Sequence, residues 1–342
     1  MAKVVTLGEI MMRLSTTGFQ RFAQASTMEL CYGGAEANVA ASLAQFGHQV
    51  TFVTKLPQNA LGDAAVKTLA GLGIDCSHIA RGGKRLGIYF LEQGASVRPS
   101  SVIYDRAGSS FTEAVPSEFD FDEIFAGADL FHISGITPVL GREAGELARY
   151  AVKKAKEHGV KVSMDLNYRA KLWNAGVEEK QKLLAELISY ADICFGNPLD
   201  AAKCLGYSVP EVDLLNCDYE VCVSEEQMKK MADAYHLEAV ITTLRESISA
   251  SDNGWSARIY TKEGLYTGSR YLLHIVDRVG GGDSFAAGCL HGFLKNMAPS
   301  DALEFGIAAA AIKHTIPGDI NYASEQEVLQ LMQNKGSGRM QR

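Results

Sequence analysis

Near its C-terminal end the sequence reads DRVGGGDSFAAG (residues 277–288). Three glycines stand directly before Asp283, which opens a stretch of small residues typical of a packed helix. Glycine lets a ligand approach the backbone closely, and a helix start presents unpaired N–H groups and the positive end of a dipole. The segment therefore predicts an anion hole formed by Gly280, Gly281 and Gly282, with Asp283 at its rim as a general base. Taken alone, it also fits a glycine-rich turn in which Asp283 only caps the helix.

A second pair of glycines precedes another helical pattern, GGAEANVA (residues 33–40). Gly33 and Gly34 leave room for a ligand against the backbone, and Asn38 can both donate and accept hydrogen bonds to hydroxyl groups. An ordinary loop-to-helix junction has the same pattern, so this segment is weak evidence by itself.

Strand and helix patterns alternate along most of the chain. Strands are expected at residues 3–8, 49–54, 129–134, 161–166, 192–195 and 239–243. Helices are expected at residues 35–46, 62–72, 141–158, 177–190, 198–205, 225–236, 283–296 and 300–314. Apolar strands that alternate with helices indicate an α/β protein with a mostly parallel sheet covered on both faces.

Two stretches, residues 10–32 and 85–112, lack a helical pattern and contain many residues that favour strands. We expect them to form a small β-sheet that projects from the main domain. Because its strands come from separate places in the chain, this sheet is an elaboration and not an independent domain. The sequence therefore predicts one domain over residues 1–334 and a flexible tail over residues 335–342.

Composition excludes several functional classes. The 342 residues carry a net charge of −7 and contain no long basic run, which argues against nucleic acid or an anionic membrane as the main partner. No apolar run is long enough to span a membrane, and the N-terminus does not resemble a signal peptide. Seven cysteines without a C-x-x-C pair indicate reduced thiols in a cytoplasmic protein. A metal or redox site at Cys217 and Cys222 is the less favoured alternative.

The two glycine segments together resemble the paired signatures of the PfkB, or ribokinase-like, carbohydrate kinases. Residues 33–40 match GG-x-x-x-N-x-A, and residues 277–285 match D-T-x-G-A-G-D-x-F except that Arg278 replaces threonine and Gly281 replaces alanine. The resemblance covers nearly the whole chain. It implies a three-layer α/β/α sandwich with a mostly parallel central sheet and a small β-sheet lid, which corresponds to residues 10–32 and 85–112.

The resemblance also implies an ATP-dependent sugar kinase that uses Mg²⁺. Asp283 would be the catalytic base, and residues 280–282 would hold the transferring phosphoryl group. Its nucleotide contacts would come from Asn167, Arg169, Asn197, Thr243, Arg245, Glu246, Gly280 and Gly282. The loop TLRES (residues 243–247) lacks the glycines common in the family, so its contacts are open. Arg278 leaves the need for a monovalent cation open, and no metal ligand is assigned.

Two further segments narrow the substrate. RPSSVIYDRAGS (residues 98–109) and DLNYR (residues 165–169) resemble those of 2-keto-3-deoxygluconate kinases. This implies phosphorylation of 2-keto-3-deoxy-D-gluconate to its 6-phosphate, because guanidinium groups bind a sugar-acid carboxylate through charge-assisted hydrogen bonds. The implied substrate contacts are Gly33, Gly34, Asn38, Tyr89, Tyr104, Arg106, Arg169, Asp283 and Asp319.

Two alternatives remain at this stage. One is a kinase of the same family for a neutral sugar, such as a fructokinase or ribokinase. The other is a sugar-binding regulator that has kept the fold and lost catalysis, against which the intact Asp283 segment argues. The sequence does not separate the gluconate from the galactonate epimer. It also leaves the oligomeric state open, although an exposed lid favours a homo-oligomer formed through it.

Overall fold

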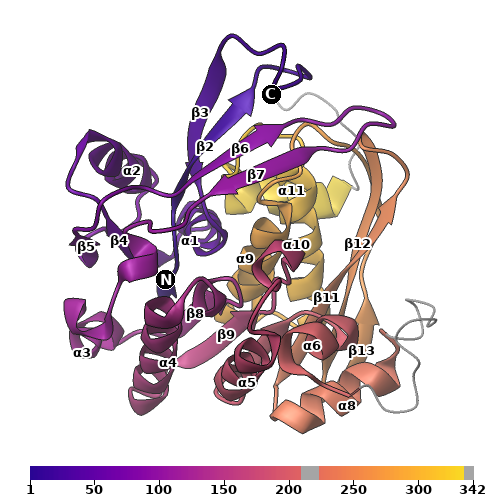
Figure 1. The fold of residues 1–342 in the computed structure, drawn as a ribbon. Helices are drawn as coiled ribbons and strands as arrows, with labels where there is room; N and C mark the ends of the chain where they lie inside the picture. Colours follow the sequence, from indigo (N-terminus) through magenta and orange to yellow (C-terminus); the bar gives the residue numbers. More distant parts are fainter. Residues whose placement is uncertain (209–222, 335–342) are drawn as a thin grey trace.

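The strands expected from the sequence lie side by side in one large sheet (Figure 1). The computed structural model describes residues 1–208 and 223–334, and in these residues the sheet has ten strands in the order β13-β12-β11-β10-β9-β8-β1-β4-β5, with β14 beside β12. Its parallel strands are β1 (Lys3–Leu7), β4 (Gln49–Leu56), β5 (Ile79–Arg81), β8 (Leu130–Ser134), β9 (Lys161–Asp165), β10 (Ile193–Phe195) and β11 (Ala239–Ser247). The predicted mostly parallel sheet is confirmed.

Helices cover both faces of this sheet and bury a hydrophobic core on each. On one face lie α1 (Ala35–Gln45), α2 (Ala60–Gly71), α9 (Gly281–Leu294), α10 (Pro299–Lys313) and α11 (Glu325–Asn334). On the other lie α3 (Phe121–Phe125), α4 (Arg142–Glu157), α5 (Val177–Ile188), α6 (Pro198–Leu205) and α8 (Glu225–Tyr235). The strands are apolar on both sides because both of their faces are buried. The expected three-layer α/β/α arrangement is therefore confirmed.

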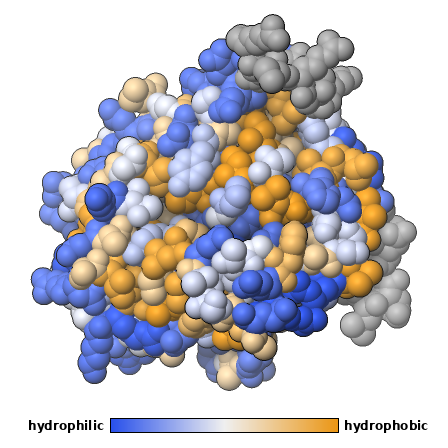
Figure 2. Space-filling view, turned by 90° about the horizontal axis from the view of Figure 1, so that it is seen from above, coloured by the Kyte–Doolittle hydropathy of each residue, from blue (hydrophilic) through white to orange (hydrophobic). Residues whose placement is uncertain are grey.

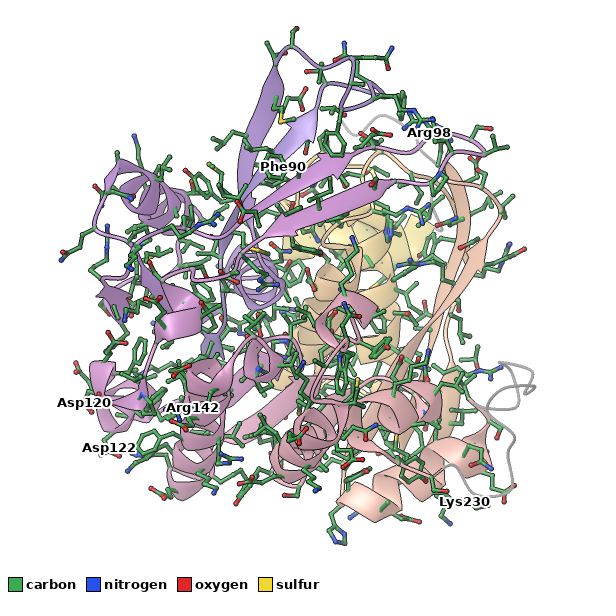
Figure 3. The ribbon with its side chains drawn as sticks, in the orientation of Figure 1. Phe90, Arg98, Asp120, Asp122, Arg142 and Lys230 are labelled. Carbon is green, nitrogen blue, oxygen red and sulfur yellow. The ribbon has the colours of Figure 1, made fainter. Side chains whose placement is uncertain are left out.

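A separate four-stranded sheet stands above one end of the large sheet (Figure 1). Its order is β3-β2-β6-β7, formed by β2 (Met11–Thr16), β3 (Met28–Gly33), β6 (Ile88–Glu92) and β7 (Ser101–Asp105). The two separated segments meet where β2 pairs with β6 in parallel, with Arg13 opposite Tyr89. Arg98, labelled in Figure 3, lies near the far end of this small sheet. It forms a 2.9 Å ion pair with Glu92.

The edge strands of the small sheet expose hydrophobic side chains. On β3 these are Met28 and Leu30, and on β7 they are Ile103 and Tyr104, each 39–52% exposed. Seen from above, the surface mixes hydrophobic and hydrophilic groups (Figure 2). An oligomer formed through this sheet remains a prediction.

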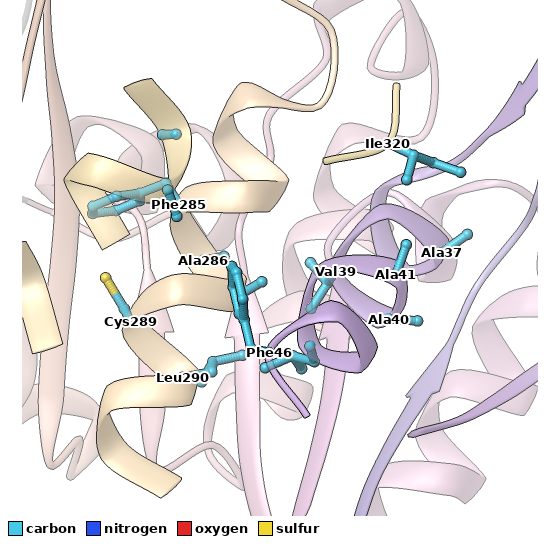
Figure 4. Close-up of a cluster of buried hydrophobic side chains, with 14 of the residues drawn as sticks. Ala37, Val39, Ala40, Ala41, Phe46, Phe285, Ala286, Cys289, Leu290 and Ile320 are labelled. Carbon is cyan, nitrogen blue, oxygen red and sulfur yellow. The ribbon is translucent and has the colours of Figure 1, made fainter. Parts of the chain in front are cut away.

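The tight contact between α1 and α9 fixes the relative position of the two glycine segments (Figure 4). Small residues on α1, including Ala37 and Ala41, let α9 approach closely, and Phe285 and Leu290 on α9 are likewise buried in this core. Close packing of this kind tolerates little change in side-chain volume. The starts of both helices therefore have a fixed relation to each other.

Several elements were not predicted, among them the short strand β5 and the short helix α3. The strands β12 (Asp252–Thr261), β13 (Gly264–Thr267) and β14 (Tyr271–His274) add an antiparallel edge, β11 runs four residues beyond the expected strand, and α11 packs on α10. Cys194, Cys204 and Cys289 are buried free thiols, and Cys31 and Cys76 are partly buried. The predictions for Cys217, Cys222 and the 335–342 tail lie outside the described residues.

In the part of the chain that the structure describes, no helix is both long and apolar enough to cross a membrane.

Candidate active site

The starts of α1 and α9 meet through a single side-chain hydrogen bond. The Asn38 amide Nδ2 donates to Oδ2 of Asp283 at 2.7 Å, while the backbone N–H of Gly34 donates to Oδ1 of Asn38 at 3.3 Å. The second bond fixes which way the amide points. Asn38 therefore orients the Asp283 carboxylate, although 245 residues separate the two.

The glycine segment forms an open helix start. Gly280 is the N-cap of α9, with a φ of 80°, and no side chain caps the helix. A Cβ at Gly280 would lie 1.9 Å from the Asp319 carbonyl oxygen, so only glycine fits, whereas a Cβ at Gly282 would meet nothing within 4 Å. Asp283 lies inside the first turn, so the alternative that it merely caps the helix is wrong. The N–H groups of Gly282 and Asp283 remain available to an anion, whereas the N–H of Gly281 donates to the Arg278 carbonyl at 3.4 Å.

A cavity of about 490 Å³ opens at this point and extends across the carboxyl ends of the parallel strands. Most of the predicted site residues line it: Gly34, Asn38, Tyr89, Tyr104, Arg106, Asn167, Arg169, Asn197, Thr243, Arg245, Gly280, Gly282, Asp283 and Asp319. Gly33 and Gly281 do not line the cavity. Gly33 packs against Asp319, and Gly281 packs against His314. Glu246 lies outside it and pairs with Arg270 at 2.5 Å.

Two carboxylates in the cavity have strongly shifted pKa values. Burial raises the pKa of Asp283 to about 6, although the hydrogen bond from Asn38 and the charge of Arg169 act to lower it. Burial, together with the charge of Asp283, raises the pKa of Asp165 to about 7. A carboxylate with a pKa near neutrality is well suited to accept a proton from a hydroxyl group.

The two predicted substrate-binding arginines have different surroundings. Arg106 donates from Nε to Oε2 of Glu9 at 2.8 Å, and its Nη2 contacts the same oxygen. Glu9 is 3% exposed and also accepts a 2.5 Å hydrogen bond from the Ser109 hydroxyl. Arg169 is exposed and donates to the carbonyl of Tyr168 at 3.3 Å. Arg106 therefore already has an anionic partner in Glu9. The expectation that both guanidinium groups lack a carboxylate until the substrate binds is wrong for Arg106.

Three guanidinium groups converge on the other half of the cavity. Arg169, Arg245 and Arg278 line it together. Partial burial and the charges of Arg278 and Arg169 lower the pKa of Arg245. Like charges at close range are unfavourable unless an anion lies between them, so this half of the cavity is suited to a polyphosphate.

Several residues of the site were not singled out from the sequence. Glu36 lines the cavity and accepts hydrogen bonds from Thr137 at 2.8 Å and from the Ser134 hydroxyl at 2.7 Å, which ties α1 to β8. Asp165 ends β9, and a polar residue at the carboxyl end of a parallel strand is a signal that could have identified it. Tyr89 donates to Asp319 at 2.6 Å, so these two predicted substrate contacts also bind each other.

Comparison with known proteins gives a consistent result. Residues 1–326 match the pfkB family carbohydrate kinases. A crystal structure of 2-dehydro-3-deoxygluconokinase from Thermotoga maritima is 47% identical with a TM-score of 0.91, covering 97% of this chain and 98% of that one. A 2-dehydro-3-deoxygalactonokinase from Haloferax volcanii is 30% identical, covering 98% of each chain. A 2-dehydro-3-deoxygluconokinase from Bacillus subtilis is 26% identical, covering 95% of this chain and 93% of the relative.

Proposed function

The chain belongs to the pfkB family of carbohydrate kinases, and we propose that it transfers the terminal phosphoryl group of ATP to 2-keto-3-deoxy-D-gluconate. The product is 2-keto-3-deoxy-6-phosphogluconate. The observation that carries this proposal is that a single cavity holds the Asn38–Asp283 pair, the open start of α9 and the arginines at positions 106 and 169. The names of the relatives described above support the choice of a sugar acid.

Asp283 is the proposed general base. With a pKa of about 6 it is mostly ionised at neutral pH, and Asn38 holds it toward the cavity. It removes the proton from the terminal hydroxyl of the sugar as that oxygen attacks the phosphoryl group. The N–H groups at the start of α9 then stabilise the charge on the transferring group, because their residues line the cavity beside Asp283 and need no rearrangement during the reaction.

The nucleotide is proposed to lie along the arginine-rich half of the cavity. Arg169, Arg245 and Arg278 offer charge to the phosphates, and Asn167, Asn197 and Thr243 line the same region. Glu246 lies outside the cavity wall, so it is the weakest of the predicted nucleotide contacts.

Two carboxylates of the cavity offer only part of a coordination shell for Mg²⁺. Asp165 and Asp200 line the cavity, and burial raises the pKa of each, so a nearby cation would stabilise their ionised forms. Within the described ranges, no group of three or more His, Cys, Asp or Glu side chains could hold a metal ion. Such a site suits Mg²⁺ that keeps most of its water and phosphate ligands. When bound, the ion would neutralise charge on the phosphates.

The Glu9–Arg106 ion pair favours a second candidate, a kinase for a neutral sugar. An arginine that already has a carboxylate partner does not need one from the substrate. An ADP-release assay with 2-keto-3-deoxygluconate, its galactonate epimer, fructose and ribose separates the two. We expect the highest kcat/KM on a 2-keto-3-deoxy sugar acid. A preference for fructose or ribose would overturn the proposal, and the absence of turnover on all four would favour the inactive regulator.

The raised pKa of Asp283 predicts the pH dependence of the reaction. Because the base acts in its ionised form, kcat/KM should fall as pH drops through about 6, and not through the usual range near 4. The hydrogen bond from Asn38 lowers this pKa, so Asn38→Ala should move the acid limb to higher pH. The measurement is kcat/KM from pH 5 to 9 for both proteins. An acid limb that stays in place would show that another group, such as Asp165, controls it.

A further inference from the structure

The hairpin between β6 and β7 reaches from the small sheet to the loop that joins β11 and β12 (Figure 1). Its tip, residues 93–98, is bonded there through Ser96, whose N–H donates to Oγ of Ser251 at 2.9 Å and whose carbonyl accepts the N–H of Ala250 at 2.7 Å. The Gln93 side chain donates from Nε2 to the carbonyl of Val276, in the segment that leads to α9. The hairpin tip therefore contacts two loops of the main domain.

The same two loops hold the side chain of Arg278, the residue that replaces the threonine of the family signature. Its Nη2 donates to the carbonyl of Ala250 at 2.9 Å. The N–H of Ile275 donates to the carbonyl of Ser251 at 2.6 Å, which ties the two loops together. Ala250 thus bonds the hairpin tip through its N–H and Arg278 through its carbonyl.

Arg278 and its neighbour Arg245 both line the cavity and are held by neutral groups. The Arg245 guanidinium lies 5.6 Å from the centre of the Trp255 ring, and Arg278 is held by backbone carbonyls. Over residues 1–208 and 223–334, neither side chain forms an ion pair with a carboxylate. Both charges therefore remain uncompensated where they meet the cavity.

Other arginines of this region have carboxylate partners. Arg106 pairs with Glu9, and Arg13 pairs with Asp319 at 2.8 Å. An arginine whose charge is already balanced gains less from a phosphate than one held only by carbonyls or a ring face. Arg278 and Arg245 are thus better suited to the phosphates of a nucleotide.

The loop at residues 248–251 is ordered from within, but its place beside the cavity depends on its neighbours. The Ser249 hydroxyl accepts the N–H groups of Ser251 and Asp252 at 3.0 and 2.9 Å, which fixes the shape of the turn. The hairpin tip then fixes the turn as a unit through Ala250 and Ser251. A guanidinium group held in advance in this way loses less freedom when it binds an anion.

We propose that the hairpin tip positions Arg278 for the phosphates of ATP by holding the loop at residues 248–251. The small sheet then contributes to both substrate sites. Tyr89 on β6 and Tyr104 on β7 line the cavity directly, whereas the tip of the same hairpin acts on the nucleotide through Arg278. The inference rests on the proposed phosphoryl transfer and deepens it, so turnover of the wild-type protein is measured first.

Arg278→Met tests the role of the guanidinium group. The change removes the charge and keeps an unbranched side chain. KM for ATP should rise by at least about tenfold, because a charge-assisted contact with a phosphate is lost, while KM for the sugar acid stays within about twofold. Calorimetry with a non-hydrolysable ATP analogue should show the same loss of affinity without any turnover.

The double variant Gln93→Ala/Ser251→Ala tests the role of the hairpin tip. It removes two of the three contacts described above and leaves Arg278 in place. KM for ATP should rise about threefold or more, and KM for the sugar acid should not change. Combining it with Arg278→Met should cause no further rise, because effects that pass through one residue are not additive. Gln24→Ala/Ser26→Ala, on the exposed connection between β2 and β3, is the matched control and should leave both KM values unchanged.

Three results would overturn the proposal. They are an unchanged KM for ATP in Arg278→Met, a hairpin variant that alters only KM for the sugar acid, and full additivity of the hairpin and Arg278 changes. If the double variant does not fold, Ser251→Ala alone is combined with Arg278→Met and judged by the same additivity. A wild-type protein that neither binds the ATP analogue nor turns over would contradict the proposed function instead.

Discussion

Replacing Asp283 with asparagine is expected to lower kcat by about a hundredfold or more while the fold persists. The carboxylate is the proposed proton acceptor, and general-base catalysis typically contributes a factor of about 10² to 10⁴. Asparagine has the same shape, and its Oδ1 can still accept the 2.7 Å hydrogen bond from Asn38. The variant therefore removes the base with little disturbance of the contact between α1 and α9. Steady-state ADP release measures the effect.

A matched control for this variant is Asp301→Asn. Asp301 also lies in the first turn of a helix, α10, but it is exposed and does not line the cavity. Its replacement should leave kcat unchanged and affect only the favourable contact between a carboxylate and the helix start, which is worth less than about 1 kcal/mol. Thermal unfolding of both variants checks the fold. Near-normal turnover by a folded Asp283→Asn protein would refute the assignment of the base.

Local patterns were sufficient to predict the layers of the fold. Each apolar strand and each helix can be recognised from a stretch of about ten residues. The strands form the expected sheet, and the helices alternate with them. The antiparallel edge was missed because β12 begins with Asp252, Asn253 and Gly254, residue types that usually mark turns. In the structure residues 253–261 of this strand pair with β11, and the strand buries Trp255 in the core. Tertiary packing thus overrides a local turn signal.

The charge pairs of the site were harder to predict from the sequence, because the two partners of each pair lie far apart in the chain. Glu9 and Arg106 are separated by 97 residues, and Arg13 and Asp319 by 306. No local pattern indicates that either arginine will find a carboxylate. The glycine segments identified the anion hole because that device is local, formed by a turn and the helix start that follows it. Pairings of this long-range kind require the fold, and they decide which charges a substrate meets.

The arginine pairing changes what is expected of the substrate-binding site. Arg169 is an exposed cation that lines the cavity, so Arg169→Ala should lower kcat/KM for the sugar acid by at least about thirtyfold. Removing one partner of a desolvated charge pair typically costs about 2–5 kcal/mol, and 1.36 kcal/mol corresponds to about tenfold. The loss on fructose, which has no carboxylate, should be smaller. Part of the loss on both sugars would come from the nucleotide, because Arg169 also lies beside Arg245.

Arg106→Ala should produce a loss of similar size, but for two separable reasons. It removes a contact that the substrate carboxylate can share, and it leaves Glu9 buried at 3% exposure without its cation. The double variant Arg106→Ala/Glu9→Gln removes that stranded charge. If the arginine binds the sugar acid, the double variant should remain impaired on the acid and recover on fructose. Full recovery on the acid would show that Arg106 only neutralises Glu9. Equal losses on acid and neutral sugars in Arg169→Ala, Arg106→Ala and the double variant would contradict recognition of a carboxylate in this cavity.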